Sequence, residues 1–236
     1  VAKKKGSQWT VEFPSYRKDV LHAMDVVEDA LIAFDFNRIP PIEPAIPSIG
    51  SLLNETTVLS NVRESMVGLG FQEIATFTLT SREKQEKMVG LFGEEFVEIA
   101  NPVSSNWGIL RKRVYPELLE FLAKNKTVEY PHRIFEVGKT LELDSSTDTK
   151  TRERNKLCIA MAGKGYGFTL IKSVLMAVCR ELGKKCTLRE SGCPTLKEGR
   201  RAESSGETRG IVGELSEEVK KNFGLEQDVV LLEMEL

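Results

Sequence analysis

The strongest constraint on the fold of this chain is a run of prolines at residues 39–47. Within eight residues the run places four prolines: Pro40, Pro41, Pro44 and Pro47. Proline has no amide hydrogen and a fixed φ angle, so a helix cannot continue through such a run and extended backbone is favoured. We therefore expect a linker here, which separates a small module in residues 1–42 from a larger domain in residues 43–236.

Length and composition indicate a soluble globular protein. The chain has 236 residues, of which 41% are hydrophobic and 29% are charged, enough for a large domain with a real core. Its 33 Lys and Arg residues nearly balance 35 Asp and Glu residues, which gives a formal charge of -2. This balance argues against a broad basic field for nucleic acid, although local basic patches stay open.

The four cysteines fit neither a zinc site nor a secreted disulfide framework. Cys158, Cys179, Cys186 and Cys193 are 21, 7 and 7 residues apart, and none forms a CxxC pair. We expect reduced thiols, and we see no signal peptide and no apolar run long enough to span a bilayer. These features predict a cytoplasmic protein without a membrane partner. The chain starts at Val1 and soon enters a strand-like segment, so we expect a fragment of a longer protein.

The spacing of apolar residues predicts helices and strands without a regular alternation. Helical spacing covers residues 19–34, 54–69, 115–122 and 169–182. Strand-like patterns cover residues 9–13, 73–79, 95–99, 156–162, 210–213 and 229–236. Such irregular mixing is typical of an α+β fold with a largely antiparallel sheet.

Two further segments carry local signals. Gly138 stands between strand-like residues 133–137 and 140–143, and this arrangement predicts a hairpin or a bulge. Residues 144–155 are polar, which predicts an exposed loop. Neither segment bears on the chemistry by itself.

Four carboxylates gather near the first predicted helix. Asp25, Glu28 and Asp29 stand at i, i+3 and i+4, so they share one face of a helix. Asp19 lies about 240° from Asp25 on an ideal helix, so it joins the others only from the helix start or through a bend. Like charges at this spacing repel, and a divalent cation such as Mg²⁺ would relieve that repulsion. The alternative is a solvated acidic face at the positive end of the helix, which spacing alone favours.

Other motifs point to structure rather than to chemistry. Gly163–Gly167 follows a strand and precedes a helix, but it matches neither phosphate-binding pattern and is better interpreted as a flexible turn. His22 and His132 lack the partners of a hydrolytic triad. A lysine run and two adjacent arginine pairs are weak indications of nucleic-acid or phosphate binding. These residues are Lys3, Lys4, Lys5, Arg111, Arg113, Arg200 and Arg201.

Several segments together resemble the β subunit of phenylalanyl-tRNA synthetases in order and spacing. The first part resembles the end of a B5 domain, and the rest resembles the catalytic-like core. The matching segments are Phe13-Pro14-Ser15-Tyr16-Arg17-Lys18-Asp19-Val20, Asp25-Val26-Val27-Glu28-Asp29, Phe36-Asn37-Arg38-Ile39-Pro40, Gly68-Leu69-Gly70-Phe71-Gln72-Glu73, Asn101-Pro102-Val103-Ser104, Leu110-Arg111, Phe135-Glu136-Val137-Gly138 and Gly210-Ile211-Val212-Gly213-Glu214-Leu215. The residues Phe71-Gln72-Glu73 and an Asp at position 29 resemble the archaeal or eukaryotic branch.

This resemblance implies a class II synthetase-like antiparallel sheet flanked by helices, preceded by the tail of a small B5 domain. It implies a partner α subunit, in an assembly of two α and two β subunits, which binds ATP and phenylalanine and charges tRNA(Phe). It also implies that Asp19, Asp25, Glu28 and Asp29 are Mg²⁺ ligands, with Asp29 in place of the usual Glu. We therefore expect a bound Mg²⁺ ion at these carboxylates rather than a solvated acidic face.

The resemblance implies no catalytic residue in this chain. Class II chemistry needs an arginine on the ATP α-phosphate, from an FRxE motif, and another on the γ-phosphate, from a GxGxGxxR motif. Phe135 and Glu136 have no arginine between them, and Gly163–Gly167 is followed by Phe-Thr-Leu-Ile. We therefore expect a scaffold with metal ligands and tRNA contacts. The alternatives are a stand-alone regulatory paralogue and, disfavoured by the missing arginines, an independent ATP-dependent ligase.

Overall fold

The computed structural model describes residues 1–236, and the chain divides into two compact units, Val1–Ser51 and Leu52–Leu236. The proline run lies at the end of the first unit, where the backbone from Pro40 onward has neither helix nor strand. The run therefore ends the regular structure of the first unit, as the fixed φ angles of its prolines require.

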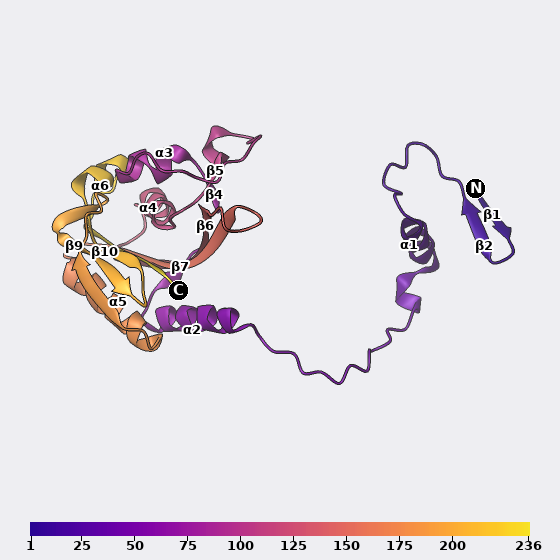
Figure 1. The fold of residues 1–236 in the computed structure, drawn as a ribbon, viewed down its shortest axis with the longest axis horizontal. Helices are drawn as coiled ribbons and strands as arrows, with labels where there is room; N and C mark the ends of the chain where they lie inside the picture. Colours follow the sequence, from indigo (N-terminus) through magenta and orange to yellow (C-terminus); the bar gives the residue numbers. More distant parts are fainter. The chain divides into compact units, whose positions relative to one another are not determined.

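The first unit has a hairpin, a helix and one short 3-10 turn. Strands β1 (Ala2–Lys5) and β2 (Gln8–Val11) pair in antiparallel register, and helix α1 (Ala23–Phe34) and 3-10 helix η1 (Phe36–Arg38) follow (Figure 1). The lysine run Lys3–Lys5 forms most of strand β1, with exposed side chains. Not one residue of this unit is buried, so its apolar side chains have no core of their own.

Helix α1 begins four residues later than its apolar spacing predicts. The ring nitrogen Nδ1 of His22 accepts a hydrogen bond from the amide of Met24 at 3.2 Å. In return, the Asp25 carboxylate accepts one from the amide of His22 at 2.6 Å. This reciprocal capping satisfies amides that the first helical turn leaves unpaired, and it fixes the helix start at Ala23.

The second unit is built on a seven-stranded sheet in which only the edge pair β3–β6 is parallel. In spatial order its strands are β3 (Gln72–Glu73), β6 (His132–Leu143), β7 (Thr151–Ala162), β11 (Val229–Glu235), β10 (Gly210–Leu215), β9 (Leu196–Gly206) and β8 (Cys186–Glu190). The expected α+β fold with a largely antiparallel sheet is confirmed. Strands β8 and β9, which are partly polar, were not predicted.

Helices cover both faces of this sheet (Figure 1). Helices α4 (Tyr115–Lys124) and α6 (Glu217–Phe223) pack on one face, and α2 (Asn54–Gly68) and α5 (Phe168–Glu181) pack on the other. Alternate residues of the central strands face the two sides, so Cys158 belongs to one core and Leu157 and Ile159 to the other. The remaining elements are β4 (Leu79–Thr80), α3 (Arg82–Gln85), η2 (Lys87–Val89), η3 (Ser105–Trp107) and β5 (Ile109–Leu110).

Three sequence expectations for this unit are wrong. Strand β6 runs without interruption through Gly138, so there is neither a hairpin nor a bulge at that residue. The polar segment 144–155 is a loop only as far as Lys150, since β7 already starts at Thr151. Of the expected strands at 73–79 and 95–99, only Gln72–Glu73, Leu79–Thr80 and a single bridge at Glu98 form.

Gly138 is required by packing rather than by a turn. A Cβ atom at this position would overlap the Arg111 guanidinium and the Glu136 carboxylate. Arg111 is only 2% exposed and donates hydrogen bonds to Glu136 Oε1 at 2.7 Å, to the Thr76 hydroxyl at 2.7 Å and to the Lys139 carbonyl at 2.9 Å. The missing side chain leaves room for this buried ion pair.

We predict that Gly138→Ala lowers the free energy of unfolding by about 2 kcal/mol, because the added methyl group pushes the buried pair apart. Urea unfolding followed by circular dichroism measures this. Gly68→Ala is the matched control, since nothing lies near its Cβ position and alanine favours the helix. Equal stability of Gly138→Ala and the unmodified chain would contradict the packing argument.

Candidate functional sites on the acidic helix and on the sheet

One end of the acidic face is held together by an arginine. Nη2 of Arg17 lies 2.8 Å from Asp19 Oδ2 and 2.8 Å from Asp29 Oδ2, so one cationic atom joins both carboxylates. Asp19 precedes helix α1, so the angle of about 240° expected for a continuous helix does not apply to it. Asp19 approaches Asp29 from outside the helix. The Arg17 guanidinium holds the pKa of Asp19 below its usual range.

The other two carboxylates are placed differently. Oδ2 of Asp25 accepts the amides of His22 and Leu21, at 2.6 and 2.7 Å, and these two bonds lower its pKa. Glu28 makes neither an ion pair nor a side-chain hydrogen bond. No group of three or more His, Cys, Asp or Glu side chains is arranged to hold a metal ion in this structure. The structure thus brings Asp19 and Asp29 together and leaves Asp25 occupied by helix capping.

The glycine-rich turn 163–167 is closed by the chain's own carboxylates. The Gly165 amide donates to Asp228 Oδ2 at 3.1 Å, and the Phe168 amide donates to Glu214 Oε1 at 3.0 Å. Since these carboxylates take the Gly165 amide and the first amide of α5, the segment behaves as a turn rather than as a phosphate loop.

A charged region that the sequence did not reveal lies on the sheet face that packs against α4. Toward one end of the strands this face is apolar, with Ala160 opposite Leu231. In the next cross-strand row, Cys158 stands between Glu136 and Glu233. In the row beyond it, Lys156 on β7 stands opposite Glu235 on β11. Cross-strand partners share a face of the sheet, so this face changes from apolar to charged within two rows. We call its charged part, Glu136, Lys156, Glu233 and Glu235, the charged floor.

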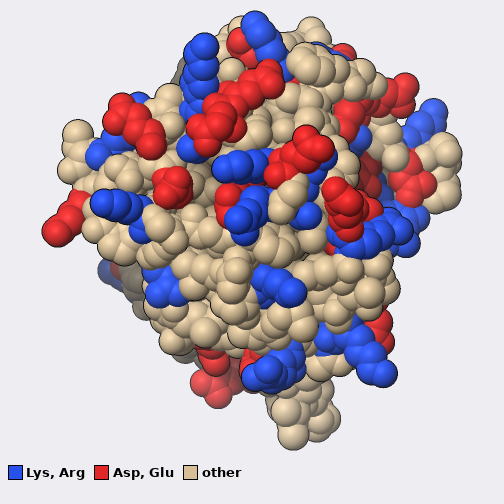
Figure 2. Space-filling view, turned by 90° about the vertical axis from the view of Figure 1, so that its left-hand side faces the viewer, with Lys and Arg blue, Asp and Glu red and all other residues tan.

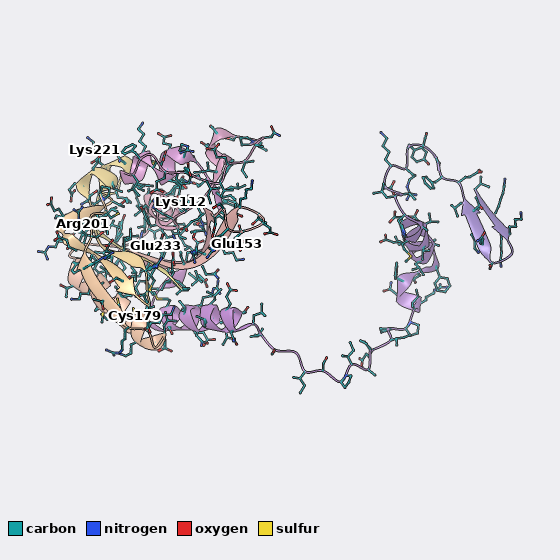
Figure 3. The ribbon with its side chains drawn as sticks, in the orientation of Figure 1. Lys112, Glu153, Cys179, Arg201, Lys221 and Glu233 are labelled. Carbon is teal, nitrogen blue, oxygen red and sulfur yellow. The ribbon has the colours of Figure 1, made fainter.

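Glu233 is the centre of this charged floor (Figure 3). Its Oε2 accepts the amides of Val114 and Tyr115 at 2.7 and 3.0 Å, at the start of helix α4. Its Oε1 lies 3.3 Å from Nζ of Lys156, which also donates to the Lys112 carbonyl at 2.7 Å. A carboxylate with these donors complements both the helix dipole and the buried ammonium.

A cavity of about 460 Å³ opens above this floor. Its wall includes Lys112 and Arg113, and both pair with the half-buried Glu94. Two further cations, Lys156 on β7 and Arg111 in the segment after β5, are also paired with carboxylates. Charged residues at inward-facing positions of otherwise buried strands, as in the last eight residues of the chain, were the one sequence signal for this region.

Comparisons with known proteins agree with the two-part organisation. Residues 39–236 match the family "Phenylalanyl tRNA synthetase beta chain CLM domain", and residues 1–36 match "tRNA synthetase B5 domain". The chain belongs to the phenylalanyl-tRNA synthetase β chain family. The Phenylalanine--tRNA ligase beta subunit of Pyrococcus horikoshii is 41% identical over 226 residues, which cover 95% of this chain and 41% of that protein. The chain thus spans about two fifths of the length of this curated relative.

Further relatives of the β chain family are archaeal too, as the resemblance predicted. The Phenylalanine--tRNA ligase beta subunit of Methanocella arvoryzae is 36% identical over 231 residues, 96% of this chain and 42% of that protein. Among solved structures, a pyrrolysyl tRNA synthetase from Desulfitobacterium hafniense superimposes with a TM-score of 0.62. It covers 77% of this chain and 66% of its own, at 15% identity, and this confirms the class II synthetase-like fold alone. Separately, none of the helices combines the length and the apolar character needed to cross a membrane.

We predict that the Lys156–Glu233 pair stabilises the β chain fold. Lys156→Met and Glu233→Gln should each lower the free energy of unfolding by about 3 kcal/mol, because each leaves a buried polar group without its charged partner. The double variant should lose less than the sum of the two. Chemical denaturation of all four proteins measures the coupling.

The matched control is the pair Lys139–Glu153, which joins β6 to β7 at 2.6 Å but is exposed to solvent. Lys139→Met and Glu153→Gln should change stability little, since exposed pairs are screened by water. Additive losses at Lys156 and Glu233 would show that the two side chains do not act as a pair.

Proposed function

We propose that this chain is a non-catalytic part of the β subunit of a phenylalanine–tRNA ligase, which attaches phenylalanine to tRNA(Phe) with ATP on a partner α subunit in the cytoplasm. The observation that carries the proposal is the family membership of the whole chain, together with relatives named as the ligase's beta subunit. In this proposal ATP and phenylalanine bind to the α subunit, and two α and two β subunits assemble.

The pairing of charges on the sheet supports a non-catalytic role. Adenylate formation needs cations that are free to meet the phosphates of ATP as charge develops. On this sheet Arg111 is held by Glu136 and Lys156 by Glu233, with 2% and 11% of the two cationic side chains exposed. The amides at the start of α4 are likewise taken by Glu233. The buried cations therefore serve the fold.

We expect the purified chain to show no phenylalanine-dependent exchange of pyrophosphate into ATP above a protein-free blank. The physical reason is the absence of both phosphate-binding arginine motifs. The reaction is followed with labelled pyrophosphate, and an active phenylalanine–tRNA ligase serves as the positive control. Exchange by this chain that survives further purification would contradict the proposal and favour an independent ligase.

The first unit supports association with a further polypeptide. Its hairpin, its helix and the segment between them expose Trp9, Leu21, Met24, Ile32 and Phe34, each by more than half. Exposed apolar side chains in such number mark an interaction surface. We assign this surface to assembly with the rest of the ligase, including the α subunit.

Contacts with tRNA from this chain alone are expected to be few. On the face of the molecule in Figure 2, lysines and arginines alternate with aspartates and glutamates and form no continuous basic surface. The formal charge of -2 agrees with this distribution. Since affinity for nucleic acid depends largely on phosphate neutralisation, most tRNA contacts should come from other parts of the ligase.

The acidic face fits a divalent cation in part. Asp19 and Asp29 already converge on one cationic atom, and carboxylate oxygens are the ligands that Mg²⁺ prefers. In this arrangement Arg17 would release both carboxylates, while Asp25 and Glu28 would complete the set directly or through water. The ion would supply charge that joins the β chain to its partner. We therefore keep Asp19, Asp25, Glu28 and Asp29 as the proposed ligands.

We predict that Asp25→Asn together with Glu28→Gln weakens assembly with the α subunit, because the ligand set loses two charges. Size-exclusion chromatography across a magnesium titration measures the assembly. The double variant Asp35→Asn and Glu43→Gln removes two other charges of the same unit and is the control. If the Asp25 and Glu28 variant assembles at the same magnesium concentration as the unmodified chain, the solvated acidic face is the correct interpretation.

A further inference from the structure

The cavity on the charged sheet face has free charges of both signs at its edge. Glu142, Glu235 and Arg209 line it, and none of the three makes an ion pair or a side-chain hydrogen bond. Glu142 and Glu235 are half-buried and Arg209 is exposed. By contrast, the deeper charges Lys156 and Glu233 are already bonded to each other.

Two of the three free charges, Glu235 and Arg209, belong to neighbouring segments. The amide of Glu235, on the central strand β11, donates to the carbonyl of Arg209 at 2.8 Å, so these two residues are adjacent across strands. Glu142 lies near the end of β6. The backbones of Glu235 and Arg209 are thus adjacent and both residues line the cavity, while Glu142 stands at another point of the edge.

The walls between these charges are partly apolar. Leu91 and Ile211 line the cavity, and both are half-buried against the core under α4. The volume of about 460 Å³ is within the range of small-molecule pockets. An apolar wall between charges of both signs is complementary to a compact zwitterion with an apolar side chain.

Glu233 narrows the choice of ligand. It holds the amides at the start of α4 and the Lys156 ammonium, which are the donors that a phosphate would need. A nucleotide therefore finds these anion-binding groups taken, whereas a single carboxylate needs only Arg209. An ammonium group is matched by Glu235.

We propose that this cavity binds a free α-amino acid with an apolar side chain. Its carboxylate would pair with Arg209, its ammonium with Glu235, and its side chain would pack on Leu91 and Ile211. The proposal does not depend on the aminoacylation role, because no step of it uses ATP, tRNA or a partner subunit.

Calorimetric titration of the full 236-residue chain tests this, with L-leucine and L-phenylalanine as probes. At least one of them should bind at one site per chain. N-acetyl-L-leucine lacks the ammonium and L-leucine amide lacks the carboxylate, so each should bind at least about tenfold more weakly than L-leucine. The absence of heat with both amino acids at millimolar concentrations would overturn the proposal.

Two variants locate the site. Arg209→Gln should weaken L-leucine about tenfold and remove the preference for L-leucine over its amide. Glu235→Gln should weaken it similarly and reduce the preference over N-acetyl-L-leucine. Both residues are at the edge of the cavity, so both variants should keep the circular dichroism spectrum of the unmodified chain.

The matched controls are Arg200→Gln and Glu198→Gln, which change exposed residues of β9 outside the cavity. They should bind L-leucine as the unmodified chain does. Equal losses in the control variants, or unchanged binding in Arg209→Gln and Glu235→Gln, would show that the amino acid binds elsewhere and would overturn the assignment.

Discussion

The carboxylate of Glu233 joins three parts of the second unit that are distant in sequence. From the central strand β11 it accepts two amides at the start of α4, and it pairs with Lys156 on β7. A buried ion pair pays a large desolvation cost and is tolerated only when further hydrogen bonds satisfy it. Here the amides supply those bonds, so the position of α4 on the sheet depends on one acidic side chain.

A second buried ion pair, between Arg111 and Glu136 on β6, is also satisfied by further hydrogen bonds. Arg111 reaches from the segment before α4 to Glu136 and Thr76, and the glycine at position 138 leaves room for it. Both networks neutralise cations that lie on the face of a synthetase-like sheet. The positive charges on this sheet are thereby used for stability, and this supports the scaffold role proposed above.

The sequence predicted well what depends on local chemistry. The bounds of α2 and α5 follow from apolar spacing, and the structure agrees within one or two residues. The role of Gly138 was misinterpreted because a glycine is needed there to leave room for the guanidinium of Arg111. No local sequence pattern shows that contact. The ion pair between Lys156 and Glu233 was missed for the same reason, because the two residues are 77 positions apart in sequence.

The acidic face shows a limit of spacing arguments on helices. The rotation of Asp19 relative to Asp25 was calculated for a helix that includes both, but His22 starts the helix after Asp19. Arg17, which sequence spacing did not single out, then brings Asp19 to Asp29. The family resemblance pointed to these carboxylates as a group, whereas the helix geometry by itself separated them.

The order of strands in the sheet also has a consequence for how the chain is made. Strand β11 comes last in sequence, yet it lies between β7 and β10 in the middle of the sheet. During synthesis the hairpin β6–β7 and the strands β8–β10 therefore leave the ribosome as two separate pieces with open edges. Only when residues 229–235 emerge can the two halves join, so the strands made earlier stay divided into two groups, and their exposed edges need protection until then.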